Sequence, residues 1–227
     1  MKAGTRFLGV VALAIGASNP AFADRDSKES LSELSAQWWQ WAISIPAKVN
    51  PLTDVGALGG QYCMVGQRGD VWFLAGSTSG RETRRSCTLP EGMPLYFPAI
   101  NTVWINTPEC DGEAFNVAQL RAKAAADIDG ATGLSVLLNN RPVKNLRRVR
   151  SEVFAVAFPD DNIFGSPPCL KRDQLYSPAV DDGYYVRLPG LSQGVHHLSI
   201  RGTNTGGFAV DVFYTLNVVK TAVRQRD

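Results

Sequence analysis

The chain has 227 residues, of which 44% are hydrophobic, and a formal net charge of +2 at neutral pH. That length suffices for one substantial core, and no internal repeat or Pro/Ser-rich linker divides it. A charge this close to zero excludes the strongly basic class of nucleic-acid-binding proteins, so we predict no nucleic-acid partner.

Residues 1–23 have the three-part pattern of a secretion signal. Lys2 and Arg6 give a basic start, residues 7–17 are apolar or small, and Ala21-Phe22-Ala23 fits a cleavage site. The apolar run is too short to span a hydrocarbon core of about 30 Å as a helix. We therefore predict a signal peptide over 1–23 and a mature chain over 24–227 without a membrane span, located in the periplasm or secreted.

Residues 30–45 are predicted to form a helix that Pro46 ends. One face of this helix carries Leu31, Leu34, Trp38, Trp41, Ala42 and Ile45. A second apolar stripe consists of Ala36, Trp39 and Ile43. Two apolar faces indicate a helix that protein covers on both sides. The alternative is that Trp39 stays exposed as a platform for a ligand.

The rest of the chain is rich in short strand candidates bounded by Gly, Pro, Asn or Asp. These candidates are 61–66, 71–76, 86–89, 95–99, 134–138, 153–158, 184–188, 195–201 and 208–219. One further helix is expected over 116–129, with Asn116 at its start and Gly130 after its end. The pattern predicts a mainly β protein: a single β-sandwich domain of jelly-roll or immunoglobulin-like type, with an N-terminal Trp-rich helix and one further helix.

The four cysteines are predicted to form two disulfides, since an even count in an exported protein indicates bridges. We favour Cys63–Cys87 with Cys110–Cys169, because the first two lie in strand candidates that are close in sequence. The other two connectivities remain open.

A family resemblance rests on the order of several segments. Between Trp38 and Asn101 the chain reads Trp-x-x-Trp, Asn-Pro-x-x-Asp, Gly-Gln-x-Gly-x-Val-Trp-Phe-Leu-Ala-Gly, Arg-x-Cys and Leu-Tyr-Phe-Pro-x-x-Asn. Near the C-terminus it contains Asp-Gly-Tyr-Tyr, Leu-Pro-Gly-Leu and Gly-Val-His. This order resembles a family of secreted bacterial proteins that has no assigned chemistry. The resemblance implies export and the β-rich fold, and it implies no activity.

Two motifs suggest catalysis or metal binding, and we interpret both as structural. Residues 190–194 match the nucleophile pattern Gly-x-Ser-x-Gly with Ser192 at its centre, but they lie between two strand candidates where the mechanism needs a strand–turn–helix elbow. His196 and His197 are adjacent on a strand, so their side chains point to opposite faces and do not share one metal. We predict no metal ligands among the histidines.

Three charged segments are interpreted as surface features. The acids of 109–113 (Glu109, Asp111 and Glu113) and of 160–161 lack the spacing of a calcium-binding loop, so no cofactor is predicted and calcium is the alternative. Arg141, Lys144, Arg147, Arg148 and Arg150 are interpreted as a solvated basic loop. Arg68-Gly69-Asp70 is interpreted as a turn into the following strand.

The prediction for function is an exported, disulfide-bonded binding or structural module without catalysis. Its ligand would be a glycan, a component of the cell envelope or a partner protein. The candidate ligand-binding residues are Trp39, Trp104, Tyr184 and Tyr185, because aromatic side chains offer stacking area together with a polar group. The alternative is an extracytoplasmic enzyme, a hydrolase or lyase, that uses carboxylates or tyrosines in a cleft to act on a polysaccharide.

Overall fold

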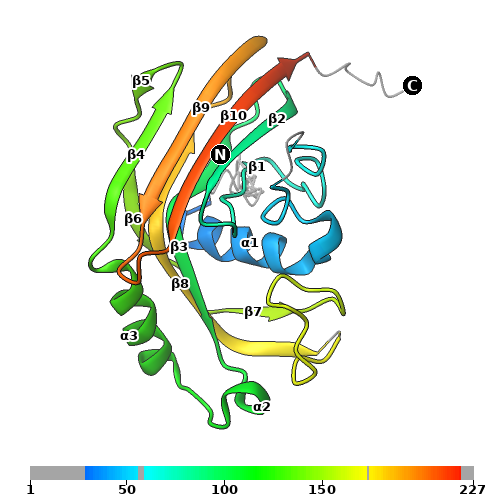
Figure 1. The fold of residues 1–227 in the computed structure, drawn as a ribbon, viewed down its shortest axis with the longest axis vertical. Coiled ribbons are helices and arrows are strands. Elements are labelled where there is room, and N and C mark those ends of the chain that lie inside the picture. Colours follow the sequence, from blue (N-terminus) through cyan, green and yellow to red (C-terminus); the bar gives the residue numbers. More distant parts are fainter. Residues whose placement is uncertain (1–28, 56–58, 173, 221–227) are drawn as a thin grey trace, which may run out of the picture.

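The computed structural model describes residues 29–55, 59–172 and 174–220. The predicted signal peptide lies outside these residues. Two mixed five-stranded sheets and three α-helices make up the described part of the fold (Figure 1). The mainly β prediction is therefore confirmed. None of the described helices is long and apolar enough to span a membrane.

The first sheet, sheet 1, has the order β1-β3-β8-β6, and β7 also pairs with β8. Its strands are β1 (Trp72–Phe73), β3 (Leu95–Ile105), β6 (Arg147–Arg150), β7 (Phe154–Ala157) and β8 (Leu175–Leu188). The pairing of β1 with β3 is parallel, and β8 pairs with β3, β6 and β7 in antiparallel fashion.

The second sheet, sheet 2, has the order β2-β10-β9-β4-β5. Its strands are β2 (Glu82–Pro90), β4 (Thr132–Leu138), β5 (Arg141–Pro142), β9 (Gly194–Thr203) and β10 (Ala209–Val219). Here β2 and β10 are parallel neighbours, whereas β10, β9, β4 and β5 pair in antiparallel fashion. The two sheets share one cluster of buried apolar side chains, to which β10 contributes every second residue from Val210 to Val218. This arrangement fits a sandwich but assigns neither the jelly-roll nor the immunoglobulin type.

Helix α1 (Leu31–Ser44) begins with a capping box, in which Ser30 and Glu33 each accept from the other's backbone N–H. It packs against sheet 1 and joins a second apolar cluster with β3, β7 and β8. Trp38 and Trp39 are both buried, so protein covers both apolar faces, as the two stripes predict. The short helix η1 (Ala47–Val49) follows directly.

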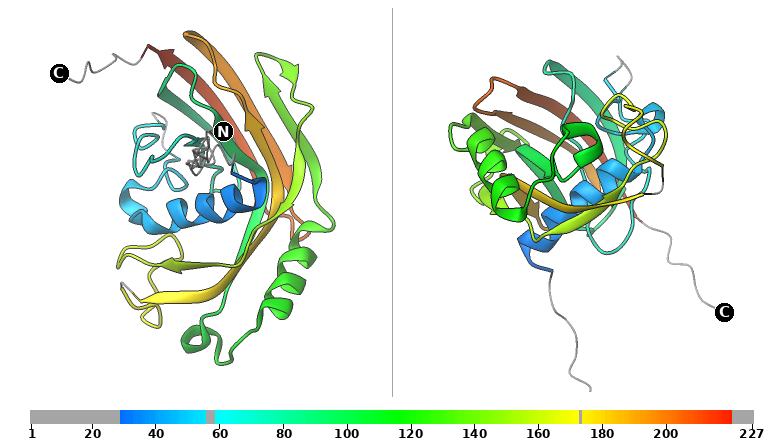
Figure 2. Two further views of the ribbon diagram at one scale, coloured as in Figure 1. Left: turned by 180° about the vertical axis from the view of Figure 1, so that it is seen from behind. Right: turned by 90° about the horizontal axis from the view of Figure 1, so that it is seen from below.

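Helices α2 (Pro108–Asp111) and α3 (Val117–Ile128) lie between β3 and β4. Asn116 and Gln119 form the capping box of α3, which packs on β3 and β8. In the two views of Figure 2, α1 and α3 lie on opposite sides of the strands. The central strand β8 is therefore covered on both faces along part of its length.

Several local predictions are wrong. Residues 61–66 form successive turns, with hydrogen bonds such as Cys63 N–H to the Gly60 carbonyl, and of 71–76 only Trp72–Phe73 is a strand. The basic segment interpreted as a loop contains the strands β5 and β6. Pairing with a neighbour decides these cases, because a short strand exists only through the hydrogen bonds of a partner.

Both predicted disulfides are present, Cys63–Cys87 and Cys110–Cys169, and no free cysteine occurs in the described residues. The first ties the turns of 60–66 to β2, and the second ties α2 to the loop before β8. The first pairing is right although Cys63 is not in a strand.

Candidate ligand-binding groove

The outer face of sheet 2 carries the side chains that alternate with the buried ones. Strand pairing places Phe213 of β10 between Arg84 of β2 and Ser199 of β9. Two residues further along β10, Thr215 lies between Ser86 and His197. The face therefore has two adjacent rows that combine one aromatic ring, one guanidinium group, one imidazole and three hydroxyl groups.

These rows form the floor of an open groove of about 700 Å³. Ser86, Ser199 and Thr215 are small, so the sheet is hollow where they meet. The rim is formed by Gly59 and Gln61 beside β2, by Leu137 and Asn140 beside β9, and by Arg201. No Asp or Glu side chain lines the groove among the described residues.

Two guanidinium groups cover the ring of Phe213. The central carbon of Arg84 lies 4.8 Å from the ring centroid, and that of Arg201 lies 5.2 Å from it. Each arginine also pairs with an acid outside the groove, Arg84 with Glu82 at 2.8 Å and Arg201 with Asp211 at 2.9 Å. The ion pairs and the ring hold both cationic groups in place, and the remaining guanidinium N–H groups have no partner among the described residues.

A tight hairpin sets one wall of the groove. Asn139 and Asn140 connect β4 to β5 with φ values of 50° and 62°, which are the left-handed values of a two-residue type I′ turn. Asn139 accepts a hydrogen bond from the His197 backbone N–H at 2.9 Å and donates its own backbone N–H to the His197 carbonyl. These bonds hold Asn140 at the rim.

The adjacent histidines have different surroundings. The His197 ring lines the groove, and no described side chain bonds to it. The His196 ring contacts the Asn139 side chain and the Ser192 carbonyl. Ser192 lies in the connection from β8 of sheet 1 to β9 of sheet 2, so this segment joins two strands and does not form the strand–turn–helix elbow of a nucleophile. Within the described residues, no group of three or more His, Cys, Asp or Glu side chains is placed to hold a metal ion.

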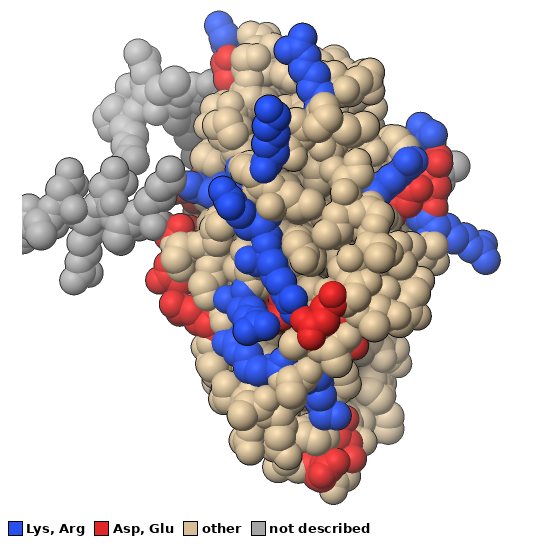
Figure 3. All heavy atoms as spheres, turned by 90° about the vertical axis from the view of Figure 1, so that its left-hand side faces the viewer, with Lys and Arg blue, Asp and Glu red and all other residues tan. Residues whose placement is uncertain are grey.

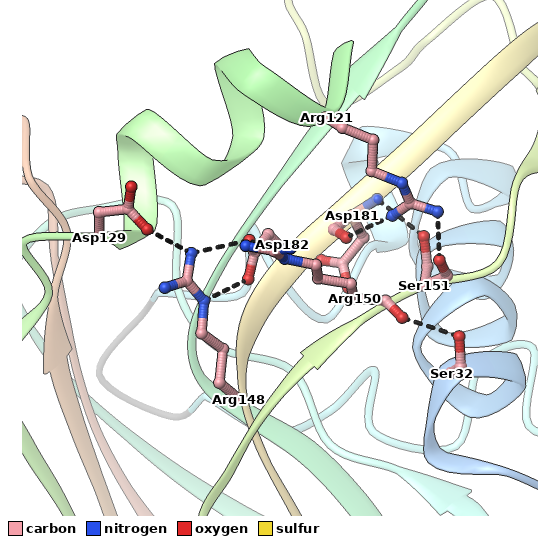
Figure 4. Close-up of polar contacts among 8 residues, drawn as sticks. All are labelled: Ser32, Arg121, Asp129, Arg148, Arg150, Ser151, Asp181 and Asp182. Atoms are coloured by element: carbon pink, nitrogen blue, oxygen red, sulfur yellow. Dashed lines mark hydrogen bonds and ion pairs between the residues drawn. The ribbon is translucent and has the colours of Figure 1, made fainter. Parts of the chain in front are cut away.

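A second polar cluster surrounds β8, where Asp181 and Asp182 point to opposite faces of sheet 1 (Figure 4). Arg148 binds both oxygens of Asp182 at 2.9 Å and reaches Asp129 at 2.7 Å. Arg150 adds a contact of 3.2 Å to Asp182. Paired charges of this kind hold β6 and the end of α3 against β8.

Asp181 occupies the α1 side of this cluster. Its Oδ1 accepts the indole N–H of Trp39 at 2.7 Å and the hydroxyl of Tyr185 at 2.8 Å, while Oδ2 has no hydrogen-bond partner among the described residues. Complete burial raises the pKa of the Asp181 carboxyl well above its ordinary value. Burial, followed by the charge of Asp181, raises the pKa of Tyr185 in turn. The ring of Tyr96 stacks on that of Tyr185. We interpret this network as a structural joint between α1 and sheet 1.

The four aromatic residues singled out from the sequence do not meet at one site. Trp39 and Tyr185 come together on Asp181, but at 8% and 1% exposure they present no face to a ligand. Trp104 is half-buried, donates to Asp127 and lies under the Lys123 ammonium group. Tyr184 is half-buried on the other face of β8. None of the four lines the groove.

The groove residues Arg84, Arg201 and Phe213 were not identified from the sequence. One signal was present: Phe213 belongs to the outward half of an alternating strand, together with Asp211, Thr215 and Asn217. An aromatic residue on the solvent side of such a strand is a candidate for ligand contact. Its arginine partners come from strands that are distant in sequence, so their approach to the ring was not visible in the chain.

Comparison of this chain with family models, with curated proteins and with solved structures finds no match in any of the three.

Proposed function

We propose that the protein is an exported binding module that holds an acidic saccharide in the groove of sheet 2. Two disulfides in a β-rich fold fit an exported protein. The observation that carries the proposal is the pair of guanidinium groups held over Phe213 above a floor of hydroxyl groups. The resemblance to secreted bacterial proteins agrees with export.

The chemistry of the groove matches a sugar that carries a carboxylate. The unused N–H groups of Arg84 and Arg201 would bind the carboxylate, which guanidinium geometry suits. Ser86, Ser199 and Thr215 would exchange hydrogen bonds with sugar hydroxyls. No described acid lines the groove itself, and the carboxylates of Glu82 and Asp211 lie outside it, in ion pairs with the same two arginines. Phe213 would act on the ligand through the two guanidinium groups that its ring holds in position.

Calorimetric titration with a tetrasaccharide of galacturonic acid tests this proposal, with a tetrasaccharide of glucose as the neutral comparison. We expect Phe213→Ala to weaken binding at least about tenfold, or 1.4 kcal/mol, and Arg84→Gln with Arg201→Gln to remove the preference for the acidic sugar. Phe208→Ala and Arg68→Gln are controls at exposed positions outside the groove. Equal affinity for both sugars in the wild type would contradict the proposal.

A second candidate is the lyase form of the enzyme alternative, and the unpartnered imidazole of His197 favours it. In an eliminative cleavage, His197 would remove the proton next to the sugar carboxylate while an arginine neutralises that carboxylate. The electrons of the broken C–H bond form a carbon–carbon double bond, the carbon–oxygen bond to the next sugar breaks with its electrons on the departing oxygen, and that oxygen takes up a proton from water. A hydrolase with two carboxylates has less support, because the groove contains none.

The two candidates differ in a simple assay. A lyase produces an unsaturated sugar, which absorbs in the ultraviolet, and His197→Ala would abolish that signal. A binding module leaves polygalacturonate intact over hours, and His197→Ala then changes only the affinity. We propose the binding module, because positioned hydroxyls and guanidinium groups account for the groove without a reaction.

A further inference from the structure

The basic residues of 141–150 lie on the edges of both sheets. β5 is the last strand of sheet 2, and β6 is the last strand of sheet 1. The segment from Asn139 to Arg150 runs from one edge to the other. On the side of the molecule that carries β4, β5 and β6, Lys and Arg side chains form a band (Figure 3).

The charges in this band divide into two groups. Arg148 and Arg150 are bound to Asp182, and Arg148 also to Asp129. Arg141, Lys144 and Arg147 are exposed and form no ion pair with any described residue. We name these last three residues the edge stripe. Because the whole chain has a net charge of only +2, the edge stripe is a local excess and does not follow from the overall composition.

We propose that the edge stripe binds the continuation of an acidic polysaccharide chain whose first sugars occupy the groove. Asn140 lines the groove, and the next residue, Arg141, begins the stripe, so the two surfaces adjoin at the β4–β5 hairpin. This inference rests on the ligand class of the proposed function. It adds that the ligand is a polymer longer than the groove and that charge along the sheet edges holds its distal part.

The composition of the band favours a hydrophilic polyanion over a membrane surface. None of the large exposed apolar side chains lies between Leu138 and Arg150. Proteins that bind at a lipid interface add such side chains to their basic residues. Two of the three stripe residues are arginine, whose planar group suits the oxyanions of a polymer. Charges on edge strands also prevent pairing between sheet edges of different molecules, and this is the competing explanation.

The experiment compares chain lengths. The proteins compared are wild type, the stripe variant Arg141→Gln/Lys144→Gln/Arg147→Gln and the control variant Lys48→Gln/Arg68→Gln/Arg81→Gln. The two variants differ from wild type by the same change in net charge. Each is titrated with tetragalacturonate and with polygalacturonate of at least about 20 sugars, at two salt concentrations. Thermal melts establish that all three proteins are folded. Phe213→Ala reports on the groove in the same assay.

The stripe variant should bind tetragalacturonate like wild type but the polymer at least about tenfold more weakly, with a reduced dependence on salt, since charge contacts to a polyanion release counterions. The control variant should change polymer affinity less than about threefold. Equal losses in both variants would show that net charge alone acts and would overturn the inference. It is also overturned if the stripe variant self-associates while the polymer affinity of its monomer is unchanged, or if wild type prefers phosphatidylglycerol vesicles or duplex DNA to the polymer.

Failure of the proposed function gives a different result. In that case wild type does not bind the tetrasaccharide, and Phe213→Ala changes nothing, whatever the stripe variant does. If Phe213→Ala weakens the binding of both ligands and the stripe variant weakens the binding of neither, the groove is a binding site and the extension onto the sheet edges is wrong.

Discussion

The indole N–H of Trp39 donates to the carboxyl of Asp181 at 2.7 Å, in a site where both side chains are buried. Trp39 lies in the middle of α1, and Asp181 lies in the middle of β8. The bond therefore joins the first helix to the central strand of sheet 1 across 142 positions of sequence.

Removing this donor should weaken the protein. Trp39→Phe retains most of the apolar area but leaves Oδ1 of Asp181 with Tyr185 alone, so we expect a loss of about 2 kcal/mol in the free energy of unfolding. Trp104→Phe is the matched control, because its indole bonds to the half-exposed Asp127 and its loss should cost less than about 1 kcal/mol. Urea denaturation followed by fluorescence measures both. Equal losses would mean that burial of the acceptor does not matter.

The same carboxyl predicts a dependence of stability on pH. Burial raises the pKa of Asp181 in the folded state above its value in the unfolded chain. The unfolded chain then gives up the proton first, so this group's contribution to stability is greatest below the unfolded pKa and falls as pH rises toward the folded pKa.

Asp181→Asn removes this titration and keeps an acceptor for Trp39 and Tyr185. The unfolding free energy of the variant minus that of wild type should therefore increase as the pH rises above the unfolded pKa of the carboxyl, and level off once the pH passes its folded pKa. Taking the difference cancels the titration of groups that lie far from Asp181. A difference that stays flat, or that decreases with pH, would contradict the shift.

Neighbouring arginines on β6 should respond very differently to the same substitution. Arg148→Gln leaves the buried Asp182 with only Arg150, so we expect a loss of about 2 kcal/mol, below the full cost of breaking a buried pair because Arg148 is partly exposed. Arg147→Gln, one position away, should change stability by less than about 0.5 kcal/mol. Thermal and urea unfolding of the two variants decide the matter. Similar effects would show that the ion pair contributes little.

The two disulfides should also differ. In the chain-entropy model, removing Cys63–Cys87 costs about 3.5 kcal/mol and removing Cys110–Cys169 about 4 kcal/mol, because the second closes the longer segment. Double replacement by alanine, measured by calorimetric melting, tests each bridge by itself. The first pair is buried in one apolar cluster with Leu89 and Trp72, so its removal also leaves a cavity, which adds to the loss expected from loop length. A negligible change at Cys110–Cys169 would contradict the loop argument.

Residue patterns alone predicted the helices α1 and α3 and the strands β9 and β10, and they favoured the disulfide pairing that the structure has. On α1, Leu34 and Trp38 on one stripe and Trp39 and Ile43 on the other recur at the four-residue spacing of a helix, and β10 alternates with the period of a strand. The even number of cysteines indicated two bridges, and the closeness of Cys63 and Cys87 in sequence favoured their pairing. Periodicity and cysteine spacing are properties of residues that are close in sequence, so they can be recognised without knowing which strands pair.

Which aromatic residues are buried and which line the groove depends on the tertiary structure. Trp39 and Tyr185 carry polar groups, and both donate a hydrogen bond to Asp181, which is distant in sequence from Trp39. Both aromatic side chains are therefore buried with their polar groups paired. Phe213 has the same outward position in any sheet, but it becomes part of a groove because β2 and β9 bring Arg84 and Arg201 to its ring. Strand order is set by the burial of whole sheet faces, a property of the assembled chain, so the sequence of any one strand does not contain it.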